Sequence, residues 1–358
     1  MYNAITDIGY VAIIPTVSVL GLIFNLISVV ILSNKSFKET MYKFLLANSI
    51  IDSIYLFVIS FLPIARCIDI CSLSSKFLPK FYELYGFLFM THVLSTASSL
   101  TSVSVAYDRF FSLSKINRCK WKFNVKLVLL FYFCFSFLNQ LPTILSFKLS
   151  KDVTNYSNSH FHYDEANANK THFHITLTKF GESREAKLLI IILQVNINLT
   201  PTTLVIIANI LLLLKLRRQA FRQKQLQRKM FFSRQNASDI QMISFNFNGS
   251  SDSQSDFEND RNNIFSKRNS KIERNLTSMI VIMSMIYVFG RFANTISATL
   301  FLFFNRHAGL IRLLILLCNV VEFSTYGMNL FVFYAFDKNF SRILNKHFDR
   351  LLKNRFTL

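Results

Sequence analysis

Three charged residues, Asp52, Arg291 and Glu322, lie inside long apolar stretches and are the side chains most able to do chemistry. A charge at the centre of a bilayer costs about 2.5–3.5 kcal/mol on insertion scales, so each should face a bundle interior and have polar partners. Because two lone charges would both be costly, we expect Arg291 and Glu322 to form an ion pair between neighbouring helices. Such a pair acts either as a ligand-operated switch or as a static strut, and both interpretations stay open.

The stretches that hold these charges are long enough to cross a membrane. Hydrophobic residues make up 51% of the 358 residues, and the mean hydropathy is +0.33. About 20 helical residues span a hydrocarbon core of roughly 30 Å, and runs of this length satisfy their backbone in lipid as helices. We therefore predict an all-α, seven-transmembrane helix bundle, with helices at about 9–33, 43–65, 83–110, 126–147, 187–215, 275–305 and 310–336.

Basic residues in the predicted loops orient this bundle. Lys and Arg number 40 against 20 Asp and Glu, which gives a net charge of +20. One set of alternate loops holds 28 of the basic residues and the other set holds 11, and the richer side should face the cytoplasm. Residues 1–8 and the long loop 148–186 are then extracellular, whereas the loop 216–274 and the amphipathic segment 337–358 are cytoplasmic. The excess charge thus describes a multi-pass plasma-membrane protein, and we expect no nucleic-acid partner.

Short motifs stand in register across the predicted helices. They are Gly21-Leu-Ile-Phe-Asn25, Leu45-Leu46-Ala47 before Asp52, Asp108-Arg109-Phe110, Pro142, Pro201 and Asn329-Leu-Phe-Val-Phe333. Together they resemble the rhodopsin-like class of G-protein-coupled receptors over nearly the whole chain. The resemblance implies a receptor embedded in the lipid bilayer, with an extracellular ligand, a heterotrimeric G protein and an arrestin as partners. No nucleophile motif, phosphate loop or Cys/His spacing indicates an enzyme.

The resemblance gives Asp52 a further meaning. With Ser98 and Asn329 it matches the interior sodium pocket of that class, and Asn25 lies beside it. An allosteric sodium ion is then the one cofactor-like group expected. The alternative is a hydrogen-bonded polar cluster that packs helices together.

The cytoplasmic end of helix three carries the predicted coupling site. By resemblance Arg109 contacts the G protein, and Asp108 with Glu273 at the base of helix six holds it in an inactive-state lock. Agonist binding would then shift helix six outward. Surface charges at helix ends are the alternative interpretation.

Helices six and seven depart from the pattern of that class. Residues 289–293 hold neither the usual Trp nor the Pro, and Leu330 replaces a proline in helix seven. Gly290 and Gly327 each stand three residues before a missing proline. Because glycine loosens a helix by about 1 kcal/mol relative to alanine, we expect these two residues to act as hinges.

The predicted ligand cavity draws polar residues from four helices: Thr91, His92, Ser95, Gln194, Asn196, Arg291, Asn294 and Glu322. Above it, Phe161–Tyr163 and Phe173–Leu177 alternate in polarity and predict a hairpin lid with a turn at 164–171. Four histidines, His160, His162, His172 and His174, would share one face of this hairpin. Imidazoles of that kind suit zinc, but exposed strand histidines are common, and we predict no metal besides sodium.

Several modifications are expected in the loops. Cys67 and Cys71 lie together outside, where a local disulfide can form, and Asn155 and Asn169 begin glycosylation sequons. Inside, the serine-rich acidic segment 250–256 belongs to a polar loop whose composition indicates disorder. It is either a regulatory phosphorylation site that contacts arrestin or an inert spacer.

A neuropeptide receptor, similar in general character to the invertebrate FMRFamide-type receptors, is the function that these features favour. Thr91 stands where aminergic receptors have an aspartate, which argues against a biogenic amine. The degenerate motifs of helices six and seven keep a divergent invertebrate chemosensory receptor as the alternative. A transporter or channel is less favoured, since Arg291 and Glu322 are its only hint.

Overall fold

The computed structural model describes residues 8–66, 76–114, 124–153, 171–243, 253–303 and 309–355, and every structural statement below refers to them. Two strands, β1 (Phe147–Val153) and β2 (Thr171–Leu177), accompany the helices. The helices in chain order, with η for π-helical turns, are η1 (Gly9–Ile13), α2 (Ile14–Leu32), α3 (Thr40–Ser60), α4 (Leu62–Arg66), α5 (Phe77–Phe81), η2 (Tyr82–Met90), α6 (Thr91–Ser114), α7 (Val125–Ser146), α8 (Lys179–Glu182), α9 (Arg184–Ile243), α10 (Ser253–Phe303), α11 (Gly309–Gly327), α12 (Asn329–Phe336) and α13 (Lys338–Arg355).

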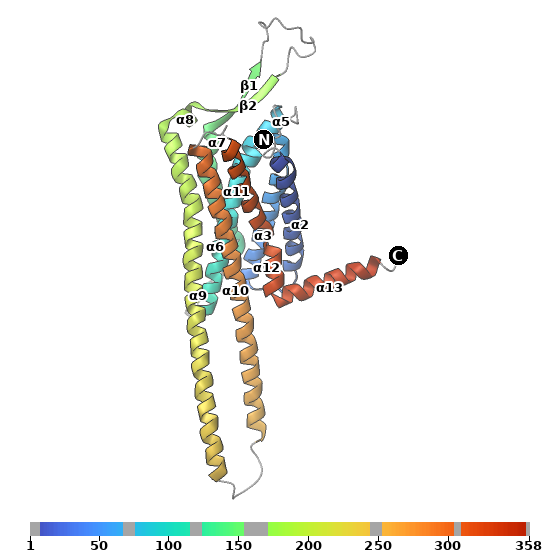
Figure 1. Ribbon diagram of the computed structural model, residues 1–358, viewed down its shortest axis with the longest axis vertical. Coiled ribbons are helices and arrows are strands. Elements are labelled where there is room, and N and C mark those ends of the chain that lie inside the picture. Colours follow the sequence, from blue (N-terminus) through green and yellow to red (C-terminus); the bar gives the residue numbers. More distant parts are fainter. Residues whose placement is uncertain are drawn as a thin grey trace.

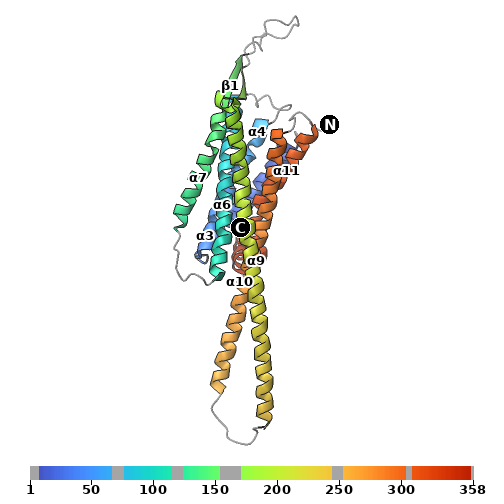
Figure 2. The same ribbon diagram turned by 90° about the vertical axis from the view of Figure 1, so that its left-hand side faces the viewer.

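The helices form the predicted bundle (Figure 1). In the part of the chain that the structure describes, six helical segments are long and apolar enough to cross a membrane: Gly9–Leu32, Thr40–Ala65, Val125–Ser146, Arg184–Arg218, Arg274–Ser297 and Gly309–Phe336. The seventh is α6, which contacts α3, α7, α9 and α10 and therefore lies at the centre. Figure 2 shows α7 at the edge of the bundle beside α6. The all-α seven-helix prediction is confirmed.

Helix α6 is less apolar than its neighbours because it is rich in Ser and Thr. Its hydroxyl groups donate to carbonyl oxygens one turn earlier, at 2.8 Å for Thr96, 2.6 Å for Ser99 and 2.8 Å for Thr101. All three side chains are buried. Since the polar atoms are satisfied within the helix, α6 can occupy a membrane interior despite its composition.

Two glycines allow helices to approach closely. A Cβ on Gly327 would lie 3.0 Å from Cα of Gly21, so α11 and α2 touch backbone to backbone at this point. A Cβ on Gly290 would meet the side chain of Thr325, which packs α10 against α11. Helix seven is also interrupted at Met328, between α11 and α12. Both glycines therefore have a packing reason, and the hinge hypothesis stays a prediction.

Two hydrophobic clusters fill the bundle and leave a polar zone between them. The first includes Leu45 on α3 and Val332 on α12, and the second includes Tyr55 on α3 and Tyr326 on α11. Asp52, the buried acid of α3, falls between these two levels of the same helix. The bundle core thus changes from apolar to polar and back along its length.

The loop predicted to be extracellular contains a hairpin, but β2 pairs with a different segment from the predicted one. β2 pairs antiparallel with β1, with Phe147 opposite Leu177 and Leu149 opposite Ile175. The predicted partner, Phe161–Tyr163, lies outside the described residues, as do the sequon asparagines Asn155 and Asn169. The alternation of Phe147 and Leu149 with Lys148 and Ser150 carries the same strand signal, and it continues directly from α7. Ser146 at the end of α7 accepts a backbone hydrogen bond from Thr178 at 2.9 Å, which fixes the register.

The segment 216–274, whose composition indicates disorder, is helical in its described parts. α9 continues to Ile243, and α10 begins at Ser253, so both project beyond the bundle in Figure 1. Good helix formers such as Gln, Lys, Arg and Leu are frequent in this stretch and favour continuation of the helix. The serine-rich segment 250–256 falls partly outside the described residues. At the same end, α13 leaves α12 sideways and buries Phe340.

Candidate functional site

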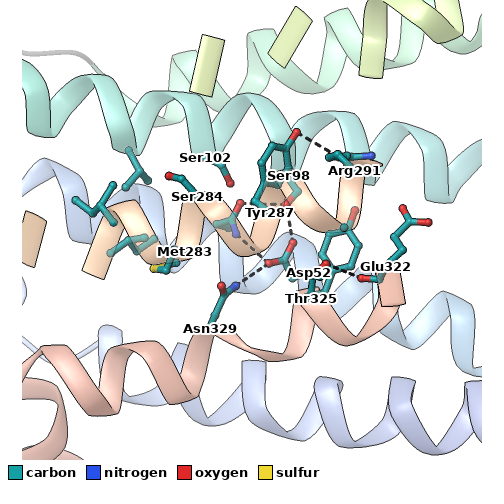
Figure 3. Close-up of a pocket in the computed structure, with 16 residues that line it drawn as sticks. Asp52, Ser98, Ser102, Met283, Ser284, Tyr287, Arg291, Glu322, Thr325 and Asn329 are labelled. Atoms are coloured by element: carbon teal, nitrogen blue, oxygen red, sulfur yellow. Dashed lines mark hydrogen bonds between the residues drawn. The ribbon is translucent and has the colours of Figure 1, made fainter. Parts of the chain in front are cut away.

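A small cavity lies in the polar zone, where side chains from α3, α6, α10, α11 and α12 meet (Figure 3). Its volume is about 40 Å³. A cavity needs about 10–15 Å³ to admit one water molecule, so this one has room for a few waters or a small ion. The charged residues that line it are Asp52, Arg291 and Glu322, the same three that stand out in the sequence.

Asp52 lines the cavity and is 1% exposed. Its Oδ1 accepts a hydrogen bond from the Ser98 hydroxyl at 2.7 Å. Its Oδ2 accepts from the amide groups of Asn48 at 2.9 Å and Asn329 at 3.1 Å. The carboxylate thus joins α3, α6 and α12, and Figure 3 shows Ser98 and Asn329 directed toward it. The structure brings together Asp52, Ser98 and Asn329, as the sequence indicated.

Asn48 belongs to this cluster although the sequence analysis did not name it. It stands one turn before Asp52 on α3, and its Oδ1 accepts from the Ser98 hydroxyl at 3.1 Å. The i, i+4 spacing to a buried acid is the signal that could have found it. Asn25, by contrast, does not bond to Asp52. Its amide nitrogen donates to the backbone carbonyl of Tyr326 at 2.9 Å and so joins α2 to α11.

Arg291 connects α10 to α6. It is 5% exposed, and its Nη2 donates to the carbonyl oxygen of Ser95 and to the hydroxyl of Ser99. Its Nε donates to the hydroxyl of Tyr287 at 3.2 Å, and the guanidinium carbon lies 5.4 Å from the centre of that ring. The charge is therefore solvated by neutral oxygens and by an aromatic face.

Glu322 connects α11 to α10 and α3. One carboxylate oxygen accepts from the Asn294 amide at 2.7 Å and from the Tyr55 hydroxyl at 3.5 Å. One turn further along α11, the Tyr326 hydroxyl lies 2.9 Å from the Ser95 hydroxyl on α6. We call Arg291, Glu322 and these neutral partners the upper layer, and the Asp52 cluster the lower layer.

The direct ion pair predicted between Arg291 and Glu322 is wrong for this structure. Across the residues that the structure describes, no pair within 4.0 Å joins these two side chains, whereas Lys80 and Glu83 do form one at 2.7 Å. The reason is rotation about the axis of α10. Arg291 points to α6, and Asn294, three residues on, takes the place opposite Glu322. In Figure 3 both charges lie beyond Asp52, on the side away from Asn329.

The remaining predicted cavity residues are more scattered. Thr91 is buried but its hydroxyl donates to the carbonyl of Phe87 in its own helix. Asn196 is exposed on α9, while Asn198, two residues on, is buried. Because α9 turns by about 100° per residue, a register error of two residues moves a side chain to another face. His92 is half-buried.

Other predicted site residues lie outside what the structure describes. The side chains of Gln194, Glu273 and His172 are among them, as are Cys67, Cys71, His160 and His162 in full. Arg109 and Asp108 are described at the cytoplasmic end of α6, and Arg109 is buried. The predicted lock with Glu273 is therefore a proposal, and so is the disulfide.

A bundle of seven long helices, with a polar helix at its centre and buried charges in its interior, is typical of seven-helix membrane receptors. The family model of the serpentine type 7TM GPCR chemoreceptor Srw matches residues 12–246. This match covers more than half of the chain, so the chain belongs to that family and is a multi-pass membrane protein. The match favours the chemosensory alternative over the neuropeptide interpretation and is to a receptor family rather than an enzyme family. A comparison with curated proteins found no match.

Proposed function

We propose that this protein is a chemosensory G-protein-coupled receptor of the plasma membrane whose ligand acts on the upper layer. The observation that carries the proposal is the bonding of Arg291. This one side chain ties α10 to two successive turns of α6. A ligand that displaces Arg291 from Ser95 and Ser99, or that draws it toward Glu322, removes that tie and lets α10 move outward from α6.

The cytoplasmic consequence follows from the continuity of α10. This helix runs from the upper layer down to the predicted G-protein side without a break. A tilt that begins near Arg291 is therefore carried to residues 273–280. There Arg109 of α6 is the proposed contact for the G protein, with Asp108 and Glu273 as its proposed partners in the inactive state and arrestin as a second cytoplasmic partner.

An Arg291→Ala variant tests this proposal. Loss of the tie between α10 and α6 should raise ligand-independent nucleotide exchange on a co-expressed G protein at least twofold per receptor at the surface. Thr295→Ala is the matched control, because the Thr295 hydroxyl donates at 2.9 Å to the carbonyl of Arg291 within the same helix. Basal exchange that stays at the wild-type level in both variants overturns the proposed tie.

A sodium ion beside Asp52 is part of the proposal. The lining fits such an ion, since a carboxylate and the hydroxyl groups of Ser98 and Ser102 border the cavity, and hard cations prefer oxygen ligands. Asp52 would hold the ion, which would supply a positive charge at the lower layer. Sodium-dependent ligand affinity in the wild type, absent in Asp52→Asn, is the expected outcome, and equal sodium dependence in both would contradict it.

A neuropeptide is the second candidate ligand, and the hairpin favours it. β1 and β2 stand above the bundle in Figure 1, and Phe173 of β2 packs edge-on against Phe77 of α5 at 5.4 Å. A hairpin anchored in this way offers a rim for an extended peptide. A parallel screen with a peptide library and a small-molecule panel, read out by calcium with a promiscuous Gα, distinguishes the two. Activation by small molecules alone excludes the peptide.

A further inference from the structure

A groove at the bend between α12 and α13 is not part of the signalling site. Its volume is about 660 Å³. The residues that the argument uses are Tyr334 on α12 and Lys338, Ser341, Arg342, Lys346 and Asp349 on α13. Lys338, Arg342 and Lys346 are four residues apart and so share one face of the helix.

The three cations are available for a ligand. Their side chains are exposed, and within the described ranges no ion pair joins any of them to an acid. Asp349 lines the C-terminal end of the groove and is the one acid among the six residues. The groove therefore has a net positive charge.

The groove opens at the depth where the hydrocarbon core ends. Met328, at the break before α12, and Phe331 and Tyr334 of α12 share a face and are 41%, 49% and 47% exposed, whereas Val332 and Phe333 are buried. In a membrane-spanning helix an exposed apolar face contacts lipid. Since Tyr334 belongs both to this face and to the groove, the groove lies directly below lipid-facing surface, within reach of headgroups.

The shape of the bend is fixed by buried contacts. Asp337 accepts backbone hydrogen bonds from Asn339 at 2.9 Å and Phe340 at 3.2 Å, which caps the start of α13. Its other oxygen accepts from the Tyr42 hydroxyl of α3 at 2.8 Å. Phe340 is fully buried, with its ring 5.2 Å from that of Phe333. The cations are therefore held on a preformed frame rather than on a loose tail.

We propose that this groove binds the headgroup of an anionic membrane lipid that carries two or more phosphates on an inositol ring. Lys338 and Lys346 are separated by about 12 Å along the helix at about 1.5 Å per residue, which is more than one phosphate fills. Arg342, midway, bonds a phosphate in bidentate fashion, and the hydroxyls of Ser341 and Tyr334 supply further donors. Basic groups next to a membrane helix attract such lipids.

The test uses the full-length receptor in nanodiscs of phosphatidylcholine with 5% phosphatidylinositol bisphosphate, and reads bound lipid by native mass spectrometry. The K338Q/R342Q/K346Q variant should lose at least tenfold in affinity for this lipid. The matched control is K35Q/K38Q/K43Q, which removes three exposed cations, two between α2 and α3 and one in the first turn of α3, and should stay within twofold of wild type. Equal loss in both variants overturns the site.

Two further arms keep the outcome unambiguous. K338R/K346R preserves the charge and should retain binding, and the melting temperature of the glutamine variant in pure phosphatidylcholine should equal that of the wild type. In discs where phosphatidylserine supplies the same total charge, the receptor should bind that lipid at least tenfold more weakly than phosphatidylinositol bisphosphate, since each phosphatidylserine headgroup carries one phosphate. Equal retention of phosphatidylserine, or equally tight binding of soluble inositol trisphosphate by the detergent-solubilised receptor, overturns the assignment to this lipid.

Discussion

The lower and upper polar layers of the bundle balance their charges in different ways. In the lower layer one carboxylate, Asp52, receives neutral donors from α3, α6 and α12. In the upper layer two opposite charges, Arg291 and Glu322, lie near each other yet bond to different neutral partners. The lower layer has its hydrogen bonds closed around a single group, whereas the upper layer retains an attraction that is not satisfied by direct contact. The fully hydrogen-bonded Asp52 cluster holds the bundle together, whereas the charges of the upper layer can be rearranged by a ligand.

The largest effect on stability is expected for Asp52→Ala, which removes the carboxylate of the lower layer. The Ser98 hydroxyl can turn fully to Asn48, but the amides of Asn48 and Asn329 lose their acceptor. An unsatisfied buried donor costs about 1–3 kcal/mol, so we expect roughly 2–5 kcal/mol of destabilisation, seen as a lower melting temperature in detergent. Asp52→Asn keeps one acceptor oxygen and should cost less than half as much. Equal melting temperatures for Asp52→Ala and the wild type would show that the Asp52 cluster does not hold the helices together.

Gly290→Ala should disturb the upper layer through sterics. The new Cβ would clash with Oγ1 of Thr325, whose hydroxyl donates to the carbonyl of Glu322 at 2.6 Å. Overpacking of this kind costs about 1–3 kcal/mol. Addition of Thr325→Gly should restore most of the melting temperature, and a double variant that is less stable than Gly290→Ala would contradict the packing assignment.

Alanine variants of two adjacent serines of α6 allow the stability of the two layers to be compared directly. Ser98 donates to Oδ1 of Asp52, which has no other donor among the described residues, whereas Nη2 of Arg291 donates both to Ser99 and to the carbonyl of Ser95. A hydrogen bond to a charged group is worth about 1.5–3 kcal/mol. Ser98→Ala should therefore cost roughly 1.5 kcal/mol, and Ser99→Ala less, when both are compared by thermal unfolding. The reverse order would mean that the upper layer is the more tightly held of the two.

The smallest effect on stability is expected for Glu322→Gln. The amide oxygen still accepts from Asn294 and Tyr55, so the free energy of unfolding should change by less than about 1 kcal/mol. The ligand response should nonetheless change, because the negative charge opposite Arg291 is gone. An agonist concentration–response curve that is unaltered would remove Glu322 from the proposed switch.

The sequence predicts the position of the polar zone better than its internal contacts. Asp52 had to have partners because a charge in hydrocarbon is costly, and residues one turn or one helix away supply them. For Arg291, the same cost is offset by a backbone carbonyl, hydroxyl groups and an aromatic ring. The spacing of residue types does not predict these partners. Spacing fixes which residues share a face of one helix, but the rotation of α10 against α6 and α11 depends on packing such as the Gly290–Thr325 contact.

The hairpin shows the same division between local and non-local information. Alternating polarity identified β2, because the period of two is local to the strand. Its partner depends on which of two similar segments reaches it in space. The hydrogen bond from Thr178 to Ser146 places β1 directly after α7, and this contact spans the whole extracellular loop. The end of α9 at Ile243 and the start of α10 at Ser253 depend likewise on more than composition, which in this segment is typical of disorder.

The central claim, that Arg291 holds α10 against α6, is tested most directly by a distance. Spin labels at Phe111→Cys on α6 and Arg274→Cys on α10 both occupy exposed positions at the cytoplasmic end. With the five native cysteines replaced, pulsed electron paramagnetic resonance measures the distance between the two labels in nanodiscs. The account predicts a longer distance population in Arg291→Ala than in the wild type and in Thr295→Ala. Identical distance distributions in all three proteins would contradict it.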